Sequence, residues 1–426
     1  MRIVDAGDLD SLAALFAGGW DAPPDVRAGV TAIVADVRAR GDAAVVDYTR
    51  RFDAPEFDAS MLRVAVPPLA QARGLVPPEV AAALELARDR VAAFHERQSA
   101  HDTRHQDADG TVSGLLVRPL ASVGAYVPGG TAALPSTVVM TAVPARIAGV
   151  GRVLVATPPG RNGRIPGGTL FACSLCGVDE VIAAGGAQAI AALAFGTQTI
   201  ARVDKIVGPG NVWVTEAKRQ LFGTCGIDSL AGPSEVLVVA DATSRPDFVA
   251  GELVAQAEHD PLARVAAVSQ DRAVLERVAA LLDGVVTGDA DRTPIVAAVL
   301  RERTFLVHAR DRAALVDVID RFAPEHLSLQ IADPWELVPH VRRAGAIFVG
   351  SHTPVASGDY IAGSNHVLPT SGAARFSSGL RLADFTRTMS VVENSAQRMR
   401  ADAAPLETLA SFEGLPAHAR TARMRR

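Results

Sequence analysis

Two side chains near the end of a predicted helix have the types and spacing of metal ligands. The stretch Gln256-Ala257-Glu258-His259-Asp260-Pro261 closes that helix, because Pro261 cannot continue it. Gln256 and His259 are three residues apart and share a face, where a side-chain oxygen and an imidazole nitrogen can bind one cation. A histidine at a helix end is more often an ordinary polar residue, so the site needs further ligands. The candidates are Asp359, His366 and His418.

The stretch Ala323-Pro324-Glu325-His326-Leu327 follows a predicted helix and precedes an extended run, and it offers two proton-transfer groups. His326 would accept the proton of an alcohol, and Glu325 would activate a water molecule. The alternative is an exposed, charged turn. Adjacent residues of a regular strand point to opposite sides, so joint action requires an irregular backbone here.

Three glycine-containing loops follow predicted strands and have features of a dinucleotide site. They are residues 126–130, which begin with Tyr126, residues 185–188, which end with Gln188, and residues 208–211, which end with Asn211. The first turn of a helix after such a loop offers free N–H groups to a pyrophosphate, and Gln or Asn can bind a ribose or an amide. Each loop also fits an ordinary tight turn. Three of them at the carboxyl ends of strands favour a nucleotide, although no G-x-G-x-x-G is present.

The elements that position these residues alternate as in a parallel α/β fold. The first hundred residues are mostly helical, with helices predicted at 26–40, 43–51 and 78–98. Short apolar strands that alternate with helices then predict two parallel sheets covered on both faces. The first set of strands is 123–127, 153–156, 181–184 and 205–207. The second set is 235–240, 265–268, 304–307 and 346–349. Its helices are predicted at 246–258 and in two segments that end at Leu282 and Phe322.

The predicted fold class is therefore α/β, with two incomplete Rossmann-like parallel-sheet domains and small helical appendages at both ends. A helical appendage occupies residues 1–22. Residues 23–127 and 235–383 form a discontinuous α/β domain that carries the metal and proton-transfer residues. Residues 128–234 form a Rossmann-like nucleotide-binding domain, and residues 384–426 form a C-terminal appendage of short charged helices.

The composition excludes two classes of partner. The 426 residues are 49% apolar and 21% charged, with a net charge of −5, so no basic surface attracts nucleic acid. The N-terminus carries Asp5, Asp8 and Asp10 and lacks the apolar run of a secretory signal. Apolar residues 138–150 are interrupted by Pro144 and are shorter than the roughly 20 residues that span a bilayer. We expect neither a nucleic-acid nor a membrane partner.

Three cysteines are too few for a disulfide framework and predict a reducing, cytoplasmic location. Cys173 and Cys176 form a C-x-x-C within an apolar, helical stretch. We interpret them as small buried side chains rather than as a redox or metal site.

The motifs together resemble the histidinol dehydrogenase family, from about Arg40 nearly to the C-terminus. The stretches that carry the resemblance are 185–196, 208–211 with 215–218, 231–237, 256–261, 323–327, 358–360 and 365–370. Long motifs in a fixed order make this resemblance specific.

The resemblance implies one zinc ion per subunit and an intertwined homodimer in which the C-terminal appendage serves dimerisation. The implied zinc ligands are Gln256, His259, Asp359 and, from the partner subunit, His418. The implied substrate-binding residues are these four together with Ser234, His326 and Glu413. The implied NAD contacts are Tyr126, Gln188 and Asn211. Zinc in this pattern holds the substrate in place as a template.

The resemblance also implies a four-electron oxidation of histidinol through the aldehyde to histidine, the final step of histidine biosynthesis. His326 takes the hydroxyl proton while hydride passes to a first NAD. Glu325 then activates a water that attacks the bound aldehyde, and the hydrate loses hydride to a second NAD with His326 again accepting a proton.

The sequence departs from the family pattern at Thr353-Pro354-Val355, where the family usually has Glu at the third position, and within 381–388. Val355 is four residues before Asp359 and would alter its surroundings. This leaves open a paralogue that uses zinc and NAD on another polar alcohol, such as a sulfonated diol. A nucleotide-binding module without catalysis is the alternative of another class, and it would not need Glu325 and His326.

Overall fold

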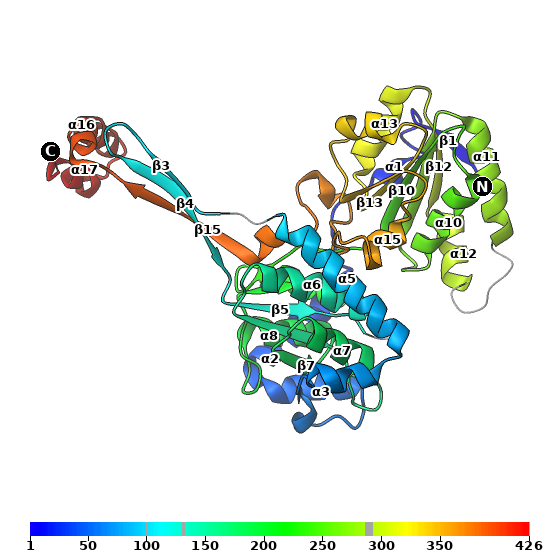
Figure 1. Cartoon of the computed structure of the whole chain (residues 1–426), viewed down its shortest axis with the longest axis horizontal. Helices are drawn as coiled ribbons and strands as arrows, with labels where there is room; N and C mark the ends of the chain where they lie inside the picture. The colour runs from blue at the N-terminus through cyan, green and yellow to red at the C-terminus, as the bar shows by residue number, and fades with distance from the viewer. Residues whose placement is uncertain (99–100, 130–132, 286–292, 426) are drawn as a thin grey trace.

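The computed structural model describes residues 1–98, 101–129, 133–285 and 293–425, which form two α/β domains and an extended arm (Figure 1). The first domain has a six-stranded sheet in the order β2-β7-β6-β5-β8-β9. Neighbouring strands are parallel except for β2, which is antiparallel to β7. The strands are β2 (Arg63–Val64), β5 (Ser122–Tyr126), β6 (Arg152–Thr157), β7 (Glu180–Ala183), β8 (Lys205–Val207) and β9 (Gly226–Ile227).

Helices on both sides of this sheet share one hydrophobic core with it. They are α2 (Pro24–Arg40), α3 (Asp42–Phe52), α4 (Leu69–Ala72), α5 (Pro78–Glu96), α6 (Pro135–Ile147), α7 (Gly167–Leu175), α8 (Gly186–Phe195) and α9 (Val212–Leu221). Cys173 and Cys176 are buried in this core as free thiols, in agreement with their interpretation as packing residues.

The second domain has a fully parallel sheet in the order β1-β12-β11-β10-β13-β14. Its strands are β1 (Ile3–Asp5), β10 (Glu235–Ala240), β11 (Arg264–Ser269), β12 (Thr304–His308), β13 (His326–Gln330) and β14 (Ala346–Val349). Alternate residues of β10 pack into two separate cores, with Val236 and Val238 in one and Leu237 and Val239 in the other. A parallel sheet buried on both faces has this arrangement.

Helices cover the two faces of the second sheet unequally. One core contains residues of α10 (Pro246–Ala257), α11 (Arg272–Val285), α12 (Thr293–Glu302) and α15 (Val355–Tyr360). The opposite core contains residues of α1 (Ala13–Phe16), α13 (Arg312–Phe322) and α14 (Pro334–Leu337).

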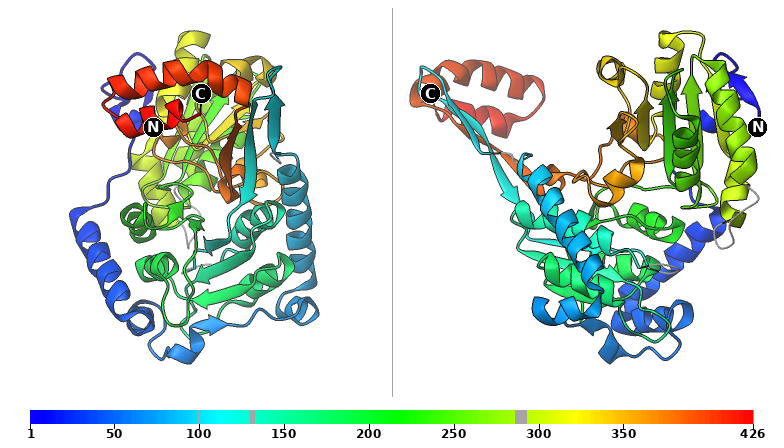
Figure 2. Two further views of the ribbon diagram at one scale, coloured as in Figure 1. Left: turned by 90° about the vertical axis from the view of Figure 1, so that its left-hand side faces the viewer. Right: turned by 45° about the vertical axis from the view of Figure 1, so that its right-hand side comes forward.

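The arm extends away from both domains and ends in a helical pair (Figures 1 and 2). It consists of an antiparallel sheet in the order β15-β4-β3, followed by helices that pack on each other. These elements are β3 (Thr103–Gln106), β4 (Val112–Pro119), β15 (Thr386–Glu393), α16 (Ala396–Phe412) and α17 (Pro416–Arg423). Within the part of the chain that the structure describes, no helix is both long and apolar enough to cross a bilayer.

The structure confirms the predicted α/β class with two parallel-sheet domains, but it corrects the predicted boundaries. Residues 24–96 and 122–127 belong to the same domain as 128–234 and not with 235–383, because β5 pairs with β6 and β8 and Val26 of α2 lies in their common core. Between them, β3 and β4 belong to the arm. The periodicity of a helical segment reports which face is buried but not against which sheet.

Both predicted appendages also differ from the structure. Residues 1–22 do not form an appendage throughout, because β1 is the edge strand beside β12 and Leu12 and Leu15 are fully buried. Residues 384–426 are part of an arm, but they begin with strand β15 rather than with charged helices. This strand is exposed along much of both faces, so it lacks the apolar alternation that would have predicted it.

Candidate active site

A cavity of about 320 Å³ is lined by residues of both domains. In the first domain the lining residues follow the carboxyl ends of β5 and β8, the usual ligand edge of a parallel sheet. In the second domain they lie at the amino ends of β10 and β13, where Ser234, Glu325 and His326 are found. The cavity also contains Asn211, Gln256, His259, Asp359, His366 and Thr370.

The loop that contains His366 connects the two domains at this cavity. His366 Nε2 is 3.3 Å from Oγ1 of Thr137 in α6, and its Nδ1 is 3.0 Å from the carbonyl oxygen of Asp359. Asn365 Nδ2 donates to the carbonyl oxygen of Met140, also in α6. Because both ring nitrogens of His366 already have partners, the structure does not favour it as a metal ligand.

His326 is the first residue of β13 and only 3% exposed. Its Nδ1 is 2.9 Å from the carbonyl oxygen of Glu235, and a carbonyl can only accept, so Nδ1 carries the proton. Nε2 is then the lone-pair nitrogen; it has no hydrogen-bond partner in the structure and lies 3.8 Å from Oδ1 of Asp359. Burial lowers the pKa of His326 to about 4, so the ring is neutral at pH 7.

Glu325 immediately precedes β13 and is buried beside His326. Its Oε2 accepts the N–H of Glu235 at 2.9 Å and is 3.5 Å from Nδ1 of His326. Burial is the main reason that the pKa of Glu325 is raised well above 4.5, with the nearby Glu235 and Asp359 adding to it. The backbone just before this pair is irregular, since Ala323 at the end of α13 has a left-handed conformation with φ of 48°, whereas His326 begins the regular strand β13.

Three of the expected metal ligands line the same cavity. Gln256 is in the last turn of α10, His259 follows that helix, and Asp359 is in α15. Burial, followed by the charge of Glu252, raises the pKa of Asp359 to about 7, as expected for a carboxyl group without a compensating cation. No group of three or more His, Cys, Asp or Glu residues able to hold a metal ion occurs within the described ranges.

The expected nucleotide contacts lie in the first domain. Asn211 lines the cavity and caps α9, its Oδ1 accepting the N–H groups of Trp213 and Val214. Tyr126 and Gln188 are buried, and Tyr126 Oη accepts the N–H of Gly186 at 3.1 Å. Burial raises the pKa of Tyr126 to about 12, so its phenol is neutral at pH 7.

Internal packing accounts for part of the glycine pattern in these loops. A Cβ at Gly208 would lie 2.2 Å from the carbonyl oxygen of Tyr126, and one at Gly185 would lie 2.6 Å from Cβ of Pro158. The ordinary-turn interpretation therefore explains these two glycines. Gly130, which belongs to the first of the three predicted loops, lies outside the described residues.

Glu413 and His418 are not brought to the cavity within one chain. Both are exposed, at the end of α16 and in α17, and the arm holds these helices away from the two domains (Figure 1). The cavity therefore contains Gln256, His259 and Asp359 of the four expected zinc ligands.

Comparison with known proteins identifies the family. The family model for histidinol dehydrogenase matches residues 21–426. A histidinol dehydrogenase of Rhodospirillum rubrum is 48% identical over 413 residues, which are 96% of this chain and 94% of that protein. One from Pseudomonas putida is 49% identical over 343 residues, covering 80% and 77% of the two chains. The chain belongs to the histidinol dehydrogenase family.

A solved structure agrees with this assignment. The crystal structure of histidinol dehydrogenase from Elizabethkingia anophelis has a TM-score of 0.92 and 32% sequence identity, and the match covers 100% of this chain and 98% of that one. The chain is therefore an oxidoreductase with the histidinol dehydrogenase fold.

The sequence interpretation missed two residues that organise this histidinol dehydrogenase site. Glu235 contacts both Glu325 and His326 through its main chain, and Arg264 forms an ion pair with it. A signal was present, because Glu235 begins an otherwise apolar predicted strand and Arg264 immediately precedes another. Charged residues in buried strands require partners.

Proposed function

We propose that this chain oxidises histidinol to histidine in two NAD-linked steps at a zinc site, as the last step of histidine biosynthesis. The observation that carries the proposal is the state of His326, whose Nδ1 is hydrogen-bonded and whose Nε2 is available as a base. Glu325 lies beside it, and three metal-type ligands share the cavity.

The residues present fit both groups that the proposal requires. One amide oxygen, one imidazole and one carboxylate suit zinc, and the residues after β5 and β8 offer NAD the carboxyl edge of a parallel sheet. When bound, zinc holds the substrate in place and NAD accepts the hydride of each oxidation. We assign the zinc site to Gln256, His259, Asp359 and His418 of the partner subunit, and NAD contacts to Tyr126, Gln188 and Asn211. Ser234 and Glu413 complete the proposed substrate site.

The protein residues perform the proton transfers. His326 Nε2 accepts the hydroxyl proton in the first oxidation and a proton of the hydrate in the second. Burial supports this role, since it keeps the imidazole neutral. The raised pKa of Glu325 makes its carboxylate a stronger base than an exposed glutamate, which suits removal of a proton from the attacking water.

The arm supports a homodimer with shared active sites. Its exposed apolar side chains include Val392, Leu409, Phe412 and Met424. Apolar groups displayed this far from a protein's own cores are typical of an interface. A partner copy that covers them would also supply the ligand missing from the single chain. The three free cysteines support a cytoplasmic location.

The structure removes the observation that favoured a different substrate. Val355 is 4% exposed and packs in the core with Phe348 rather than lining the cavity. Its N–H donates to Glu252 at 3.2 Å, so a carboxylate is retained beside α15 without a glutamate at position 355.

The test is turnover of histidinol and NAD by the purified protein, with NADH, histidine and bound zinc measured together. Two NADH per histidine and one zinc per subunit are expected. His326→Asn should abolish both oxidations and retain zinc, because His326 is not among the proposed ligands. The Glu325→Gln variant should release the aldehyde, because it can still carry out the first oxidation but cannot activate the water needed for the second.

The matched control is His340→Asn, which changes an exposed histidine outside the cavity. It should leave turnover unchanged. Oxidation of another alcohol but not of histidinol would overturn the substrate, and normal turnover by His326→Asn would overturn the assignment of the base.

A further inference from the structure

The main chain of Glu235 holds both proton-transfer side chains at once. Its N–H donates to Oε2 of Glu325, and its carbonyl oxygen accepts Nδ1–H of His326, each at 2.9 Å. The second contact selects the imidazole tautomer with a lone pair on Nε2. A displacement of Glu235 would therefore disturb the base and the water-activating carboxyl together.

The side chain of Glu235 is itself fixed within the protein. It is 1% exposed and forms an ion pair with Nη2 of Arg264, its register partner on the adjacent strand β11. The same oxygen, Oε1, accepts the N–H of Ser371 at 3.1 Å. Removing two charges from water costs free energy, so a buried ion pair at this place is poorly explained by stability alone.

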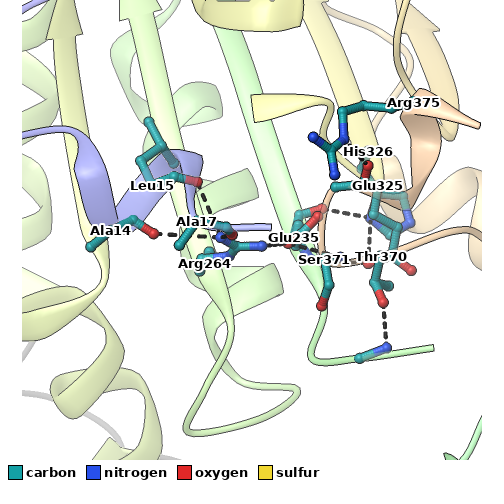
Figure 3. Close-up of polar contacts among 12 residues, drawn as sticks. Ala14, Leu15, Ala17, Glu235, Arg264, Glu325, His326, Thr370, Ser371 and Arg375 are labelled. Atoms are coloured by element: carbon teal, nitrogen blue, oxygen red, sulfur yellow. Dashed lines mark hydrogen bonds and ion pairs between the residues drawn. The ribbon is translucent and has the colours of Figure 1, made fainter. Parts of the chain in front are cut away.

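Arg264 links the ion pair to a separate part of the chain (Figure 3). Its Nη1 donates to the carbonyl oxygens of Ala14, Leu15 and Ala17, and its guanidinium lies 5.5 Å from the centre of the Phe322 ring. The guanidinium of Arg264 thus connects β10 to the C-terminal end of α1, because a planar group with several N–H donors can bind several acceptors at once.

The contact with Ser371 connects the ion pair to the cavity wall. Thr370, the preceding residue, lines the cavity, and its Oγ1 accepts the N–H of Gly232. Glu235 is therefore held by β11, by the N-terminal segment through Arg264, and by the 370–371 segment.

We propose that the Arg264–Glu235 ion pair is a positioning device that sets the geometry of Glu325 and His326 through the main chain of Glu235. This inference rests on the proposed function for the roles of those two residues. Neither Arg264 nor Glu235 lines the cavity, so we expect their effect to be on the catalytic step rather than on substrate binding. A small misplacement of catalytic groups reduces rates by up to about 100-fold.

The first test compares Arg264→Met with Arg264→Lys in the zinc-loaded protein. Arg264→Met should lower kcat by about 10-fold to 100-fold and change the KM for histidinol by less than about threefold. Arg264→Lys keeps a cation for Glu235 and should recover kcat to within about fivefold of the original chain. Glu235→Ala should lower kcat as Arg264→Met does. Glu235→Gln should keep kcat close to that of the original chain, because glutamine retains the oxygen that accepts from Arg264 and Ser371.

The matched control is Arg146→Met, since Arg146 also joins two carbonyl oxygens, of Gly177 and Val150, to a carboxylate, Asp179, but in the first domain. It should leave kcat and KM unchanged. An unchanged kcat in Arg264→Met, a rise in KM that matches the fall in kcat, or no recovery in Arg264→Lys would overturn the proposal.

A second measurement needs no turnover. The Nδ1–H signal of His326, observed by NMR with ¹⁵N-labelled histidine and assigned by its loss in His326→Asn, should shift or broaden in Arg264→Met and not in Arg146→Met. An unchanged signal would refute the positioning role even for an active enzyme. Failure of the unmodified protein to oxidise histidinol would instead refute the proposed function.

Discussion

The two residues proposed for proton transfer, Glu325 and His326, illustrate how burial shifts the pKa values of neighbouring side chains in opposite directions. Desolvation lowers the pKa of His326 and raises that of Glu325, because in each case the charged form loses its contact with water. Both groups are therefore biased toward neutrality. The neutral imidazole leaves His326 ready to accept a proton, and the raised pKa makes the Glu325 carboxylate a stronger base than an exposed glutamate.

Burial of His326 should make the stability of the chain depend on pH. In the unfolded chain this histidine titrates near 6.5, whereas in the folded chain its pKa is about 4. Below pH 6.5 the unfolded state therefore takes up a proton that the folded state does not, and stability falls as the pH falls toward 4. From this residue we expect a loss of about 1 to 2 kcal/mol between about pH 6.5 and pH 5.

The measurement is denaturant unfolding of the metal-free chain at both pH values, with His326→Asn as the comparison. The variant lacks the titrating ring, so its free energy of unfolding should fall less than that of the unmodified chain. Equal losses in the two proteins would contradict the assigned pKa.

The pairing of β14 with the start of β13 shows how a strand positions Glu325, the side chain proposed to activate water. Gly345 precedes β14, and its N–H donates to the carbonyl oxygen of Pro324 at 2.9 Å. The next residue, Ala346, donates to the carbonyl oxygen of Glu325. The main chain of Glu325 is thus aligned by the neighbouring strand as well as by Glu235.

We expect Gly345→Ala to impair catalysis. A Cβ at this position would lie 2.5 Å from the carbonyl oxygen of Glu325, so the backbone that carries the water-activating carboxyl has to move. Overpacking of this kind costs about 1 to 3 kcal/mol in stability, and we expect kcat to fall at least about 10-fold. Steady-state kinetics and thermal unfolding measure the two effects.

Gly251→Ala provides the control for Gly345→Ala. Gly251 is in α10, the helix that carries Gln256, and a Cβ there would meet nothing within 4 Å. Alanine is favoured over glycine within a helix by up to about 1 kcal/mol, so this variant should be as stable as the original chain or more so and fully active. A similar loss of kcat in both variants would show that the backbone at Gly345 has no special role in positioning Glu325.

In the whole molecule, the arm places the C-terminal helices α16 and α17 far from the two domains of the same chain (Figure 1). Glu413 follows α16 and His418 lies in α17. In a single chain the arm holds these helices away from both domains (Figures 1 and 2). The proposed shared site gives these helices a function, since a second copy would deliver them to the first copy's cavity.

Co-expression of two inactive variants tests this sharing. His326→Asn paired with His418→Asn should regain about one quarter of the original activity, because half of the dimers are mixed and one of their two sites has both histidines. Histidine formation is the measured quantity. His326→Asn paired with Glu325→Gln is the control and should regain none, because these residues belong to one cavity of one chain. Equal outcomes for the two pairs would contradict the shared site.

Residue types and local periodicity were sufficient to predict most of the central elements, and together with the family resemblance they pointed to the residues proposed for the chemistry. Apolar stretches such as 235–240 and 346–349 coincide with β10 and β14, because hydrophobic burial on both faces of a parallel sheet is recorded locally. The motifs around Gln256, Glu325 and Asp359 likewise lead to residues that share one cavity.

What required the folded structure is the set of relations between distant segments. Three features depend on contacts between segments far apart in the chain. They are the pairing of β1 with β12, the antiparallel sheet of the arm, and the ion pair between Arg264 and Glu235. The hydrophobic pattern of a helix or strand describes the burial of that one segment. Strand pairing and the main-chain hydrogen bonds of Glu235 depend instead on the packing of all segments together. For this reason the sequence indicated candidate groups for the chemistry, whereas three-dimensional packing determined how these groups are held.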